Sequence, residues 1–240
     1  MDATQVRVVD PAFPDLPGGL SVLPAIPADT APAAKILLAV KPQMLDAVAA
    51  EVARLVGPET RVLSILAGVE IAALKDRFPE AAQIVRIMPN LPAALGKGVI
   101  AIHGTDGPDD ETCALMAPLG LVEWIDDEGL LHLVAALAAS GPAFLYRFID
   151  ALGIAGARLG LAPDQSARLA LAMVEGSAML AAQSGEAPAM LADRVASKGG
   201  MTREGLDVLD ADEALVRLLT DTLAAAEKRS AEMGDAARRT

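Results

Sequence analysis

The chain has 240 residues, 53% of them hydrophobic, and a formal net charge of −12 at pH 7. This composition excludes a disordered chain, and the acidic balance argues against binding nucleic-acid phosphates as the main task. No uninterrupted apolar run reaches the ~18 residues that a membrane-spanning helix needs. We therefore expect neither nucleic acid nor a membrane as a partner.

The cysteine and the two histidines offer little for redox or metal chemistry. The only cysteine, Cys113, closely follows Asp110 and Glu111, and such acidic neighbours disfavour a reactive thiolate. A single cysteine forms no internal disulfide and fits a reducing compartment, so we expect a cytoplasmic location. His103 and His132 lie far apart with no further ligand at metal-binding spacing, and we predict no metal site.

The first half of the chain alternates short β-branched runs with helical patterns. The runs are nearly continuous in apolar residues, which is typical of strands covered by helices on both faces. Alternation at this spacing predicts a parallel sheet with right-handed crossovers. Strands are expected at 5–9, 36–40, 62–65, 84–88, 98–103 and 121–125, and helices at 44–56, 71–78 and 109–117.

One usual component of a dinucleotide-binding fold is missing from the sequence. Such folds open with a strand, a G-x-G-x-x-G turn and a helix. Here the chain begins with what resembles the second strand, and the pair Gly18 and Gly19 is no substitute because prolines surround it. Asp10, at the end of that strand, is either an acid for a ribose or part of a surface Asp-Pro turn.

From about residue 128 onward the pattern is helical and rich in alanine and leucine. A long helix over 130–159 should kink or restart at Gly141 and Pro142, and Gly185 should end the following helix in a left-handed conformation. Helices with such apolar surfaces often pack against a second copy, which favours a dimer. The further helices are expected at 163–185, 188–196, 202–209 and 212–233.

Three turns at the carboxyl ends of neighbouring strands carry unusual residues. Ligands of open parallel sheets bind beyond these ends, so the turns should meet on one rim. Lys41 offers a cation for phosphate or ribose, Ala67 and Gly68 let a flat ring approach the backbone, and the amide of Asn90 can bond a carboxamide. The alternative is that all four are ordinary turn residues.

The loop at 197–202 is the most distinctive feature of the helical half. Gly199 and Gly200 precede a helix, so successive backbone N–H groups and the positive helix end can hold an anion, while Thr202 offers a hydroxyl. The alternative is a glycine hinge with Thr202 as the N-cap of the helix.

Four segments make residues 35–232 similar to the pyrroline-5-carboxylate reductases. The twelve-residue segment of the loop resembles the family's signature, and the order and spacing of the other three agree with it. The segments are AVKPQ at 39–43, RIMPNLP at 86–92, ASGPA at 139–143 and VASKGGMTREGL at 195–206.

This resemblance implies a function. It implies hydride transfer from NADPH or NADH to the C=N carbon of 1-pyrroline-5-carboxylate, giving L-proline in the last step of proline biosynthesis. Thr202 would be the catalytic residue that bonds the ring nitrogen. Family members are homodimers, often rings of dimers, in which the loop of one subunit completes the site of the other. The cofactor-lining residues would be Ala39, Val40, Lys41, Pro42, Ala67, Gly68 and Asn90, and the substrate-binding residues Ser197, Gly199, Gly200, Met201 and Thr202.

The fold class is therefore α/β: a Rossmann-like parallel sheet, with its first strand and Gly-rich turn missing, followed by an all-α dimerisation domain. We place the dinucleotide-binding domain at 1–126 and the helical dimerisation and substrate domain at 127–240. The sequence departs from the family at the Gly-rich turn, at Lys198 in place of proline, at Met201 in place of a small residue or threonine, and at Ala139, where many members have glycine. Alternatives are a truncated or non-catalytic relative that forms a helical dimer, or another imine or keto reductase.

Overall fold

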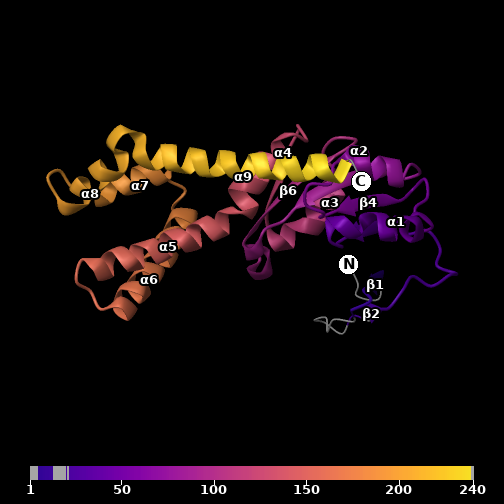
Figure 1. Cartoon of the computed structure of the whole chain (residues 1–240), viewed down its shortest axis with the longest axis horizontal. Helices are drawn as coiled ribbons and strands as arrows, with labels where there is room; N and C mark the ends of the chain where they lie inside the picture. Colours follow the sequence, from indigo (N-terminus) through magenta and orange to yellow (C-terminus); the bar gives the residue numbers. More distant parts are fainter. Residues whose placement is uncertain (1–4, 13–19, 21, 239–240) are drawn as a thin grey trace.

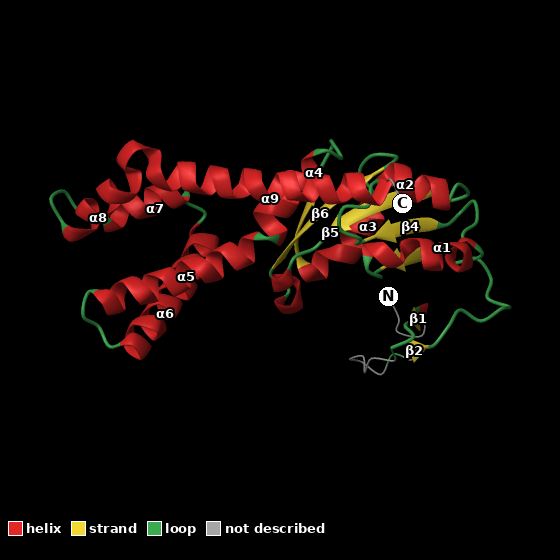
Figure 2. Ribbon diagram, viewed as in Figure 1, coloured by secondary structure: helices red, strands yellow, loops and turns green. Residues whose placement is uncertain are grey.

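A computed structural model describes residues 5–12, 20 and 22–238 of the chain. A sheet covered by helices forms one end of the molecule, and two helical arms extend from it toward the other end (Figures 1 and 2). One arm is a hairpin of α5 and α6, and the other consists of α7, α8 and the long helix α9, which returns to the sheet.

The main sheet has five strands in the order β3-β4-β5-β6-β7. β3, β4 and β5 are parallel and in register, with Leu38 paired to Ser64 and Ser64 to Arg86. Strand–helix–strand alternation thus gives the parallel pairing that the sequence predicts for this part. The strands are β3 (Lys35–Leu38), β4 (Arg61–Ser64), β5 (Gln83–Met88), β6 (Gly98–Gly104) and β7 (Gly120–Trp124).

The sheet is parallel, as the sequence predicts, except at β6, which runs antiparallel to β5. The reason is the length of the connection. Only a short 3₁₀ helix, η4 (Leu91–Leu95), separates the two strands, whereas a parallel crossover needs a dozen or more residues. β7 is parallel to β6 again, because α3 (Asp110–Met116) supplies a full crossover.

The expected strand at residues 5–9 does not belong to this sheet. Only β1 (Val8–Val9) forms, and it pairs with β2 (Val22–Leu23) in a separate two-stranded sheet. Asp10 accepts a hydrogen bond of 2.8 Å from the backbone N–H of Ala12, so it forms a local turn, as the surface-turn alternative proposed. Gly18 and Gly19 lie outside the described residues.

Both faces of the central strands are covered, as their continuous apolar sequences predict. Successive side chains of a strand point to opposite faces, so Val62 packs with α1 (Leu45–Ala53) and α2 (Ile71–Arg77), while Leu63 packs on the α3 side. The edge strand β3 differs, because Leu37, the register partner of Leu63, is 53% exposed.

The thiol of Cys113 lies on α3 against the second core cluster. Burial raises its pKa, and the carboxylates of Asp109 and Asp110 raise it further. The thiolate is therefore disfavoured at neutral pH, in agreement with the inert thiol expected from the sequence.

The helical half contains the predicted interruption near Pro142, and a π-helical segment precedes it. Gly185 ends its helix with a φ of 67°, the left-handed cap that was expected. The elements are α4 (Leu130–Val134), the π-helical η6 (Ala135–Ala139), α5 (Gly141–Arg158), α6 (Pro163–Ser184), α7 (Pro188–Val195), α8 (Met201–Asp210) and α9 (Ala214–Arg238).

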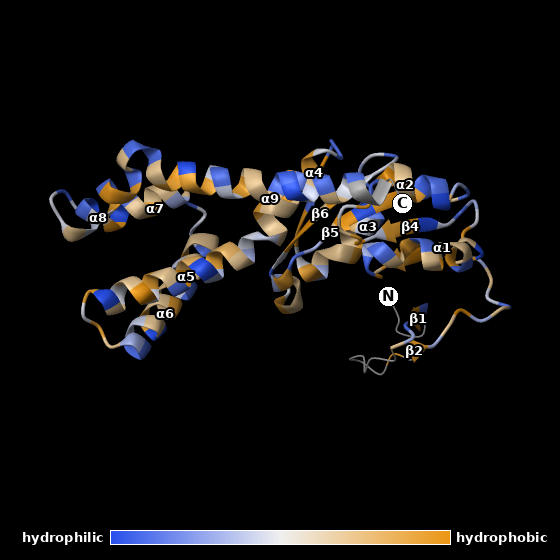
Figure 3. Cartoon of the chain, viewed as in Figure 1, coloured by the Kyte–Doolittle hydropathy of each residue, from blue (hydrophilic) through white to orange (hydrophobic). Residues whose placement is uncertain are grey.

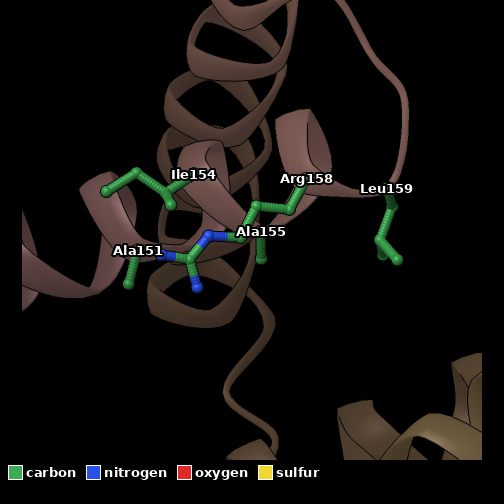
Figure 4. A pocket seen from close by; sticks show the side chains of 5 residues that line it. All are labelled: Ala151, Ile154, Ala155, Arg158 and Leu159. Atoms are coloured by element: carbon green, nitrogen blue, oxygen red, sulfur yellow. The ribbon is translucent and has the colours of Figure 1, made fainter.

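Hydrophobic residues are frequent along the arms (Figure 3), and many of their large apolar side chains are exposed, among them Leu159, Met201 and Val208. By length and composition, the continuous stretch Leu130–Arg158 could cross a membrane, and 11% of its most apolar window is buried. A hollow on α5 lies in this surface, and the Arg158 side chain runs across it toward Ala151 (Figure 4). The other residues lining the hollow are Ile154, Ala155 and Leu159.

Candidate functional site

The three predicted turns lie next to one another at the carboxyl edge of the sheet. β3, β4 and β5 are adjacent and parallel, so the segments that follow Leu38, Ser64 and Met88 leave from the same edge. A hydrogen bond of 3.1 Å from the N–H of Ile65 to the carbonyl of Leu38 continues the pairing beyond the strands. The geometric part of the sequence prediction is thus confirmed, and ligand binding there stays a prediction.

Lys41 is exposed at this edge, and its ammonium has no hydrogen bond or ion pair to any described residue. Its carbonyl accepts from the N–H of Met44 at 2.8 Å, which starts the 3₁₀ turn η3 (Pro42–Met44) ahead of α1. Ala39 is exposed as well, whereas the Val40 side chain packs partly against the core. A free cation thus lies beside the amino end of a helix, which is a favourable place for an anion.

The turn after β4 presents Ala67 to solvent and buries Gly68. Gly68 has a φ of 75°, a conformation that side chains rarely adopt. The hydroxyl of Ser64 accepts from the N–H of Leu66 at 3.3 Å and so fixes the start of the turn. The small residues predicted to admit a flat ring are therefore held in one defined loop.

Asn90 has a structural task that the sequence did not indicate. Its Oδ1 accepts from the N–H of Val99 at 2.9 Å, and its Nδ2 donates to the carbonyl of Ala138 at 2.9 Å. In a regular helix that carbonyl would bond the N–H of residue 142, but Pro142 has none. Asn90 thus supplies the missing donor and ties the rim to the π-helical joint, which leaves one amide hydrogen for a ligand.

The loop at 197–202 forms a tight turn and then a helix. Gly199 has a φ of 70° at the third position of the turn, where a positive φ favours glycine. The N–H of Gly200 donates to the carbonyl of Ser197 at 3.0 Å and closes the turn, and the binding of an anion by Gly199 and Gly200 stays a prediction. Gly200 is the N-cap of α8, so Thr202 is not the N-cap, contrary to the alternative considered from sequence.

At the start of α8, the backbone N–H groups without partners among the described residues belong to Met201 and Thr202, just after the glycine pair that the sequence singled out. The N–H groups of Met201 and Thr202 open α8 without intrahelical partners, and the Thr202 hydroxyl makes no hydrogen bond to a described residue. Lys198 and Met201 are exposed. Arg203 is bound to Asp193 at 2.7 Å, and this hydrogen bond raises its pKa. The loop therefore combines open amides with a free hydroxyl.

One chain does not bring the rim and the loop together. α8 lies at the far end of the second arm, and α9 runs from there back to the sheet (Figure 1). From Ala214 to Gly234, which contacts the rim, the helix rises about 30 Å at 1.5 Å per residue. A binding site that combines the rim residues with the loop at 197–202 would therefore need two copies of the chain, one supplying the rim and the other the loop.

Sequence reasoning missed an ion pair just below the rim. Arg86 points out of β5 with 4% of its side chain exposed and donates to Glu128 at 2.8 Å. The same carboxylate oxygen accepts from the N–H of Ile71 at 2.7 Å and so caps α2. The available signal was a lone charge within the apolar run at 84–88, since a buried charge needs a partner.

His103 and His132 each bond another part of the fold. His103 bonds the carbonyl of Ile125 at 2.7 Å and stacks on Trp124. His132 bonds the hydroxyl of Ser230 at 3.0 Å. Within the described part of the chain, no group of three or more histidine, cysteine or acidic side chains is placed to hold a metal ion.

Comparisons with known proteins agree with both halves of the structure. The family model described as pyrroline-5-carboxylate reductase dimerisation matches residues 128–233, the region of the arms. A pyrroline-5-carboxylate reductase of Pseudomonas aeruginosa is 34% identical over 206 residues, which are 83% of this chain and 74% of that protein.

Two solved structures extend the similarity to the fold. The reductase of Coxiella burnetii is 30% identical with a TM-score of 0.77, and the match covers 84% of this chain and 76% of that one. The reductase of Plasmodium falciparum, solved with NADP bound, is 26% identical with a TM-score of 0.69, covering 83% and 77% of the two chains. The chain therefore belongs to the pyrroline-5-carboxylate reductase family, whose dimerisation domain forms its helical arms.

Proposed function

We propose that the chain is a NAD(P)H-dependent reductase that converts 1-pyrroline-5-carboxylate to L-proline. The observation that carries this proposal is the identity of 34% with a pyrroline-5-carboxylate reductase over 74% of its length, because this match includes both the sheet and the arms. The cytoplasmic location and the assembly of dimers into a ring remain predictions from the sequence.

The residues of the rim fit the nicotinamide part of a dinucleotide. The exposed Ala67 leaves room for a flat ring, and the unpaired ammonium of Lys41 matches a ribose or phosphate oxygen. When bound, the reduced nicotinamide would supply the hydride. The protein would orient the ring and keep its reactive face toward the substrate.

The substrate carboxylate would bind at the beginning of α8. The N–H groups of Met201 and Thr202 point out of the helix, whose positive end favours an anion. The Lys198 ammonium, one residue ahead of the two glycines, adds positive charge to the same loop. The amide of Gly200 closes the turn that places these two N–H groups at the start of the helix.

Thr202 would polarise the imine. Its hydroxyl is free, so it can donate to the ring nitrogen while the amides beside it hold the carboxylate. Among its charged neighbours, Arg203 is bound to Asp193, Glu204 follows in the first turn of α8, and residues 197–202 themselves contain no acid. The substrate would therefore enter with its imine protonated, or accept its proton with help from this hydroxyl.

The function is tested by a proline-forming assay. The purified chain is mixed with 1-pyrroline-5-carboxylate and either NADPH or NADH, and coenzyme oxidation and proline are measured together. We expect equal amounts of oxidised coenzyme and proline. Coenzyme binding without proline would point to another imine or keto substrate, and absence of binding would favour a non-catalytic relative.

Replacing Thr202 by alanine should lower kcat/KM for the imine by about 100-fold, the usual effect of losing one proton-transfer or polarising group. Thr202→Ser keeps the hydroxyl and should retain most activity. The matched control is Thr220→Ala, which removes a hydroxyl bonded only to its own helix, at the carbonyl of Val216. If Thr202→Ala and Thr220→Ala have the same kcat/KM, Thr202 has no such role.

A further inference from the structure

The carboxyl-terminal part of α9 lies directly on the turn that follows β4. Gly68 and Gly234 meet backbone to backbone. A Cβ added at Gly68 would lie 3.3 Å from the nitrogen of Gly234, and one added at Gly234 would lie 3.1 Å from the carbonyl oxygen of Gly68. Both distances are shorter than ordinary van der Waals contact, so a side chain at either position would push the helix and the turn apart, and the positive φ of Gly68 adds strain there.

His132, on α4, connects α9 to the start of α2 through its ring. Its Nδ1 bonds the Ser230 hydroxyl of α9 at 3.0 Å, and its Nε2 lies 3.8 Å from Oε1 of Glu70, the residue before α2. The side chains of His132 and Glu70 are only 13% and 16% exposed, so water competes little with these contacts. α4, α9 and the start of α2 therefore converge around Gly68.

This cluster lies at the turn that is predicted to border the cofactor. Gly68 is buried beneath α9, while its neighbour Ala67 is exposed at the rim. Along the rest of its length α9 packs on α4 and η6 or continues into the arm (Figure 1). The helix thus contacts the turn directly at Gly68, and a shift of the helix would move the turn.

We propose that the last turns of α9 hold the Ala67–Gly68 turn in its ligand-binding position, which makes Ser230, Gly234 and His132 positioning residues for the nicotinamide cofactor. This inference rests on the proposed function, because it takes Ala67 and Gly68 as part of the cofactor site. It adds that a helix of the dimerisation region contributes to cofactor affinity from within the same chain.

The test combines hydrogen–deuterium exchange of the ligand-free protein with NADPH binding by titration calorimetry. Gly234→Ala should speed exchange across residues 64–70 and raise the Kd for NADPH about tenfold, because small displacements of a positioned group are costly. Ser230→Ala removes one hydrogen bond and should raise that Kd about threefold, whereas Ser230→Thr should restore it. The KM for the imine should stay unchanged in all three variants.

The matched control is Gly176→Ala in α6, where an added Cβ meets nothing within 4 Å. It makes the same change in helix propensity and should leave exchange at 64–70 and the Kd for NADPH unaltered. If Gly234→Ala does not fold, Ser230→Ala and Ser230→Thr decide the question by the same two measurements.

The proposal is overturned if the folded variants bind NADPH like the wild type, or if NADPH binding weakens without a change in exchange at 64–70. A wild-type chain that binds neither NADPH nor NADH would contradict the proposed function itself, and the cofactor role of α9 with it. Normal binding by the wild type with unaltered variants would contradict only the role of α9.

Discussion

A dimer formed from two differently inactivated copies should recover about half of the wild-type kcat, because one of its two sites is intact. One copy carries Ala67→Phe, which fills the open rim, and the other carries Thr202→Ala. Each alone should be nearly inactive. Co-expression with two different affinity tags isolates the mixed dimer, and the proline-forming assay measures its turnover.

This recovery follows from the distance between the two groups of residues. The loop at 197–202 and the rim lie at opposite ends of one chain, with about 30 Å of α9 between them. If each site combines the rim of one copy with the loop of the other, the mixed dimer contains one doubly altered site and one unaltered site. If each chain used its own loop, both sites would carry one substitution.

The control pairs two rim variants, Ala67→Phe and Lys41→Glu, in a mixed dimer. Each site then contains one altered rim, so activity should not recover. Recovery in this control would show that exchange of activity between copies has another cause. Light scattering confirms that the first mixed dimer has formed. If this dimer does not recover activity, the two copies do not share their sites.

Glu128→Ala should lower the free energy of unfolding by about 3–5 kcal/mol, the cost of leaving a buried charge without its partner. Arg86 has 4% of its side chain exposed and would lose Glu128, and the N–H of Ile71 would lose its cap. Urea unfolding at one fixed protein concentration measures the change, since stability of an oligomer depends on concentration.

Two further variants separate the charge from the cap. Glu128→Gln keeps an acceptor for Ile71 and should cost less than alanine. Adding Arg86→Leu to Glu128→Gln removes the buried charge and should regain most of the stability, because apolar replacement of a buried pair is often neutral. A cost below about 1 kcal/mol for Glu128→Ala would mean that the pair is effectively solvated.

Local pattern predicted the positions of most elements and of the rim. Strands β4 and β5 followed from continuous apolar runs, and the three turns followed from parallel order, since adjacent parallel strands share an edge. The signal for the direction of β6 was present in the sequence, because the connection between the expected strands at 84–88 and 98–103 is too short for a parallel crossover. Local pattern placed residues 5–9 in the sheet because a β-branched run does not reveal its pairing partner.

Contacts between residues far apart in the sequence could not be predicted either, because a local pattern does not identify the distant partner. Nothing near Asn90 indicates that it bonds Ala138, and nothing near Gly68 indicates Gly234. The loop was recognised, yet which of its amides stay free depended on the turn closed by Gly200. The division at residues 126 and 127 and the roles of the site residues remain predictions.

The hydrogen bond from Asn90 to Ala138 makes the rim and the joint of the arms parts of one rigid corner. The start of α5 is therefore held in part by an amide that also belongs to the predicted cofactor site. Substitutions at this asparagine would alter both the predicted cofactor site and the way in which two copies of the chain fit together. Transplanting arms between relatives would accordingly succeed only when the loop containing this asparagine is transplanted with them.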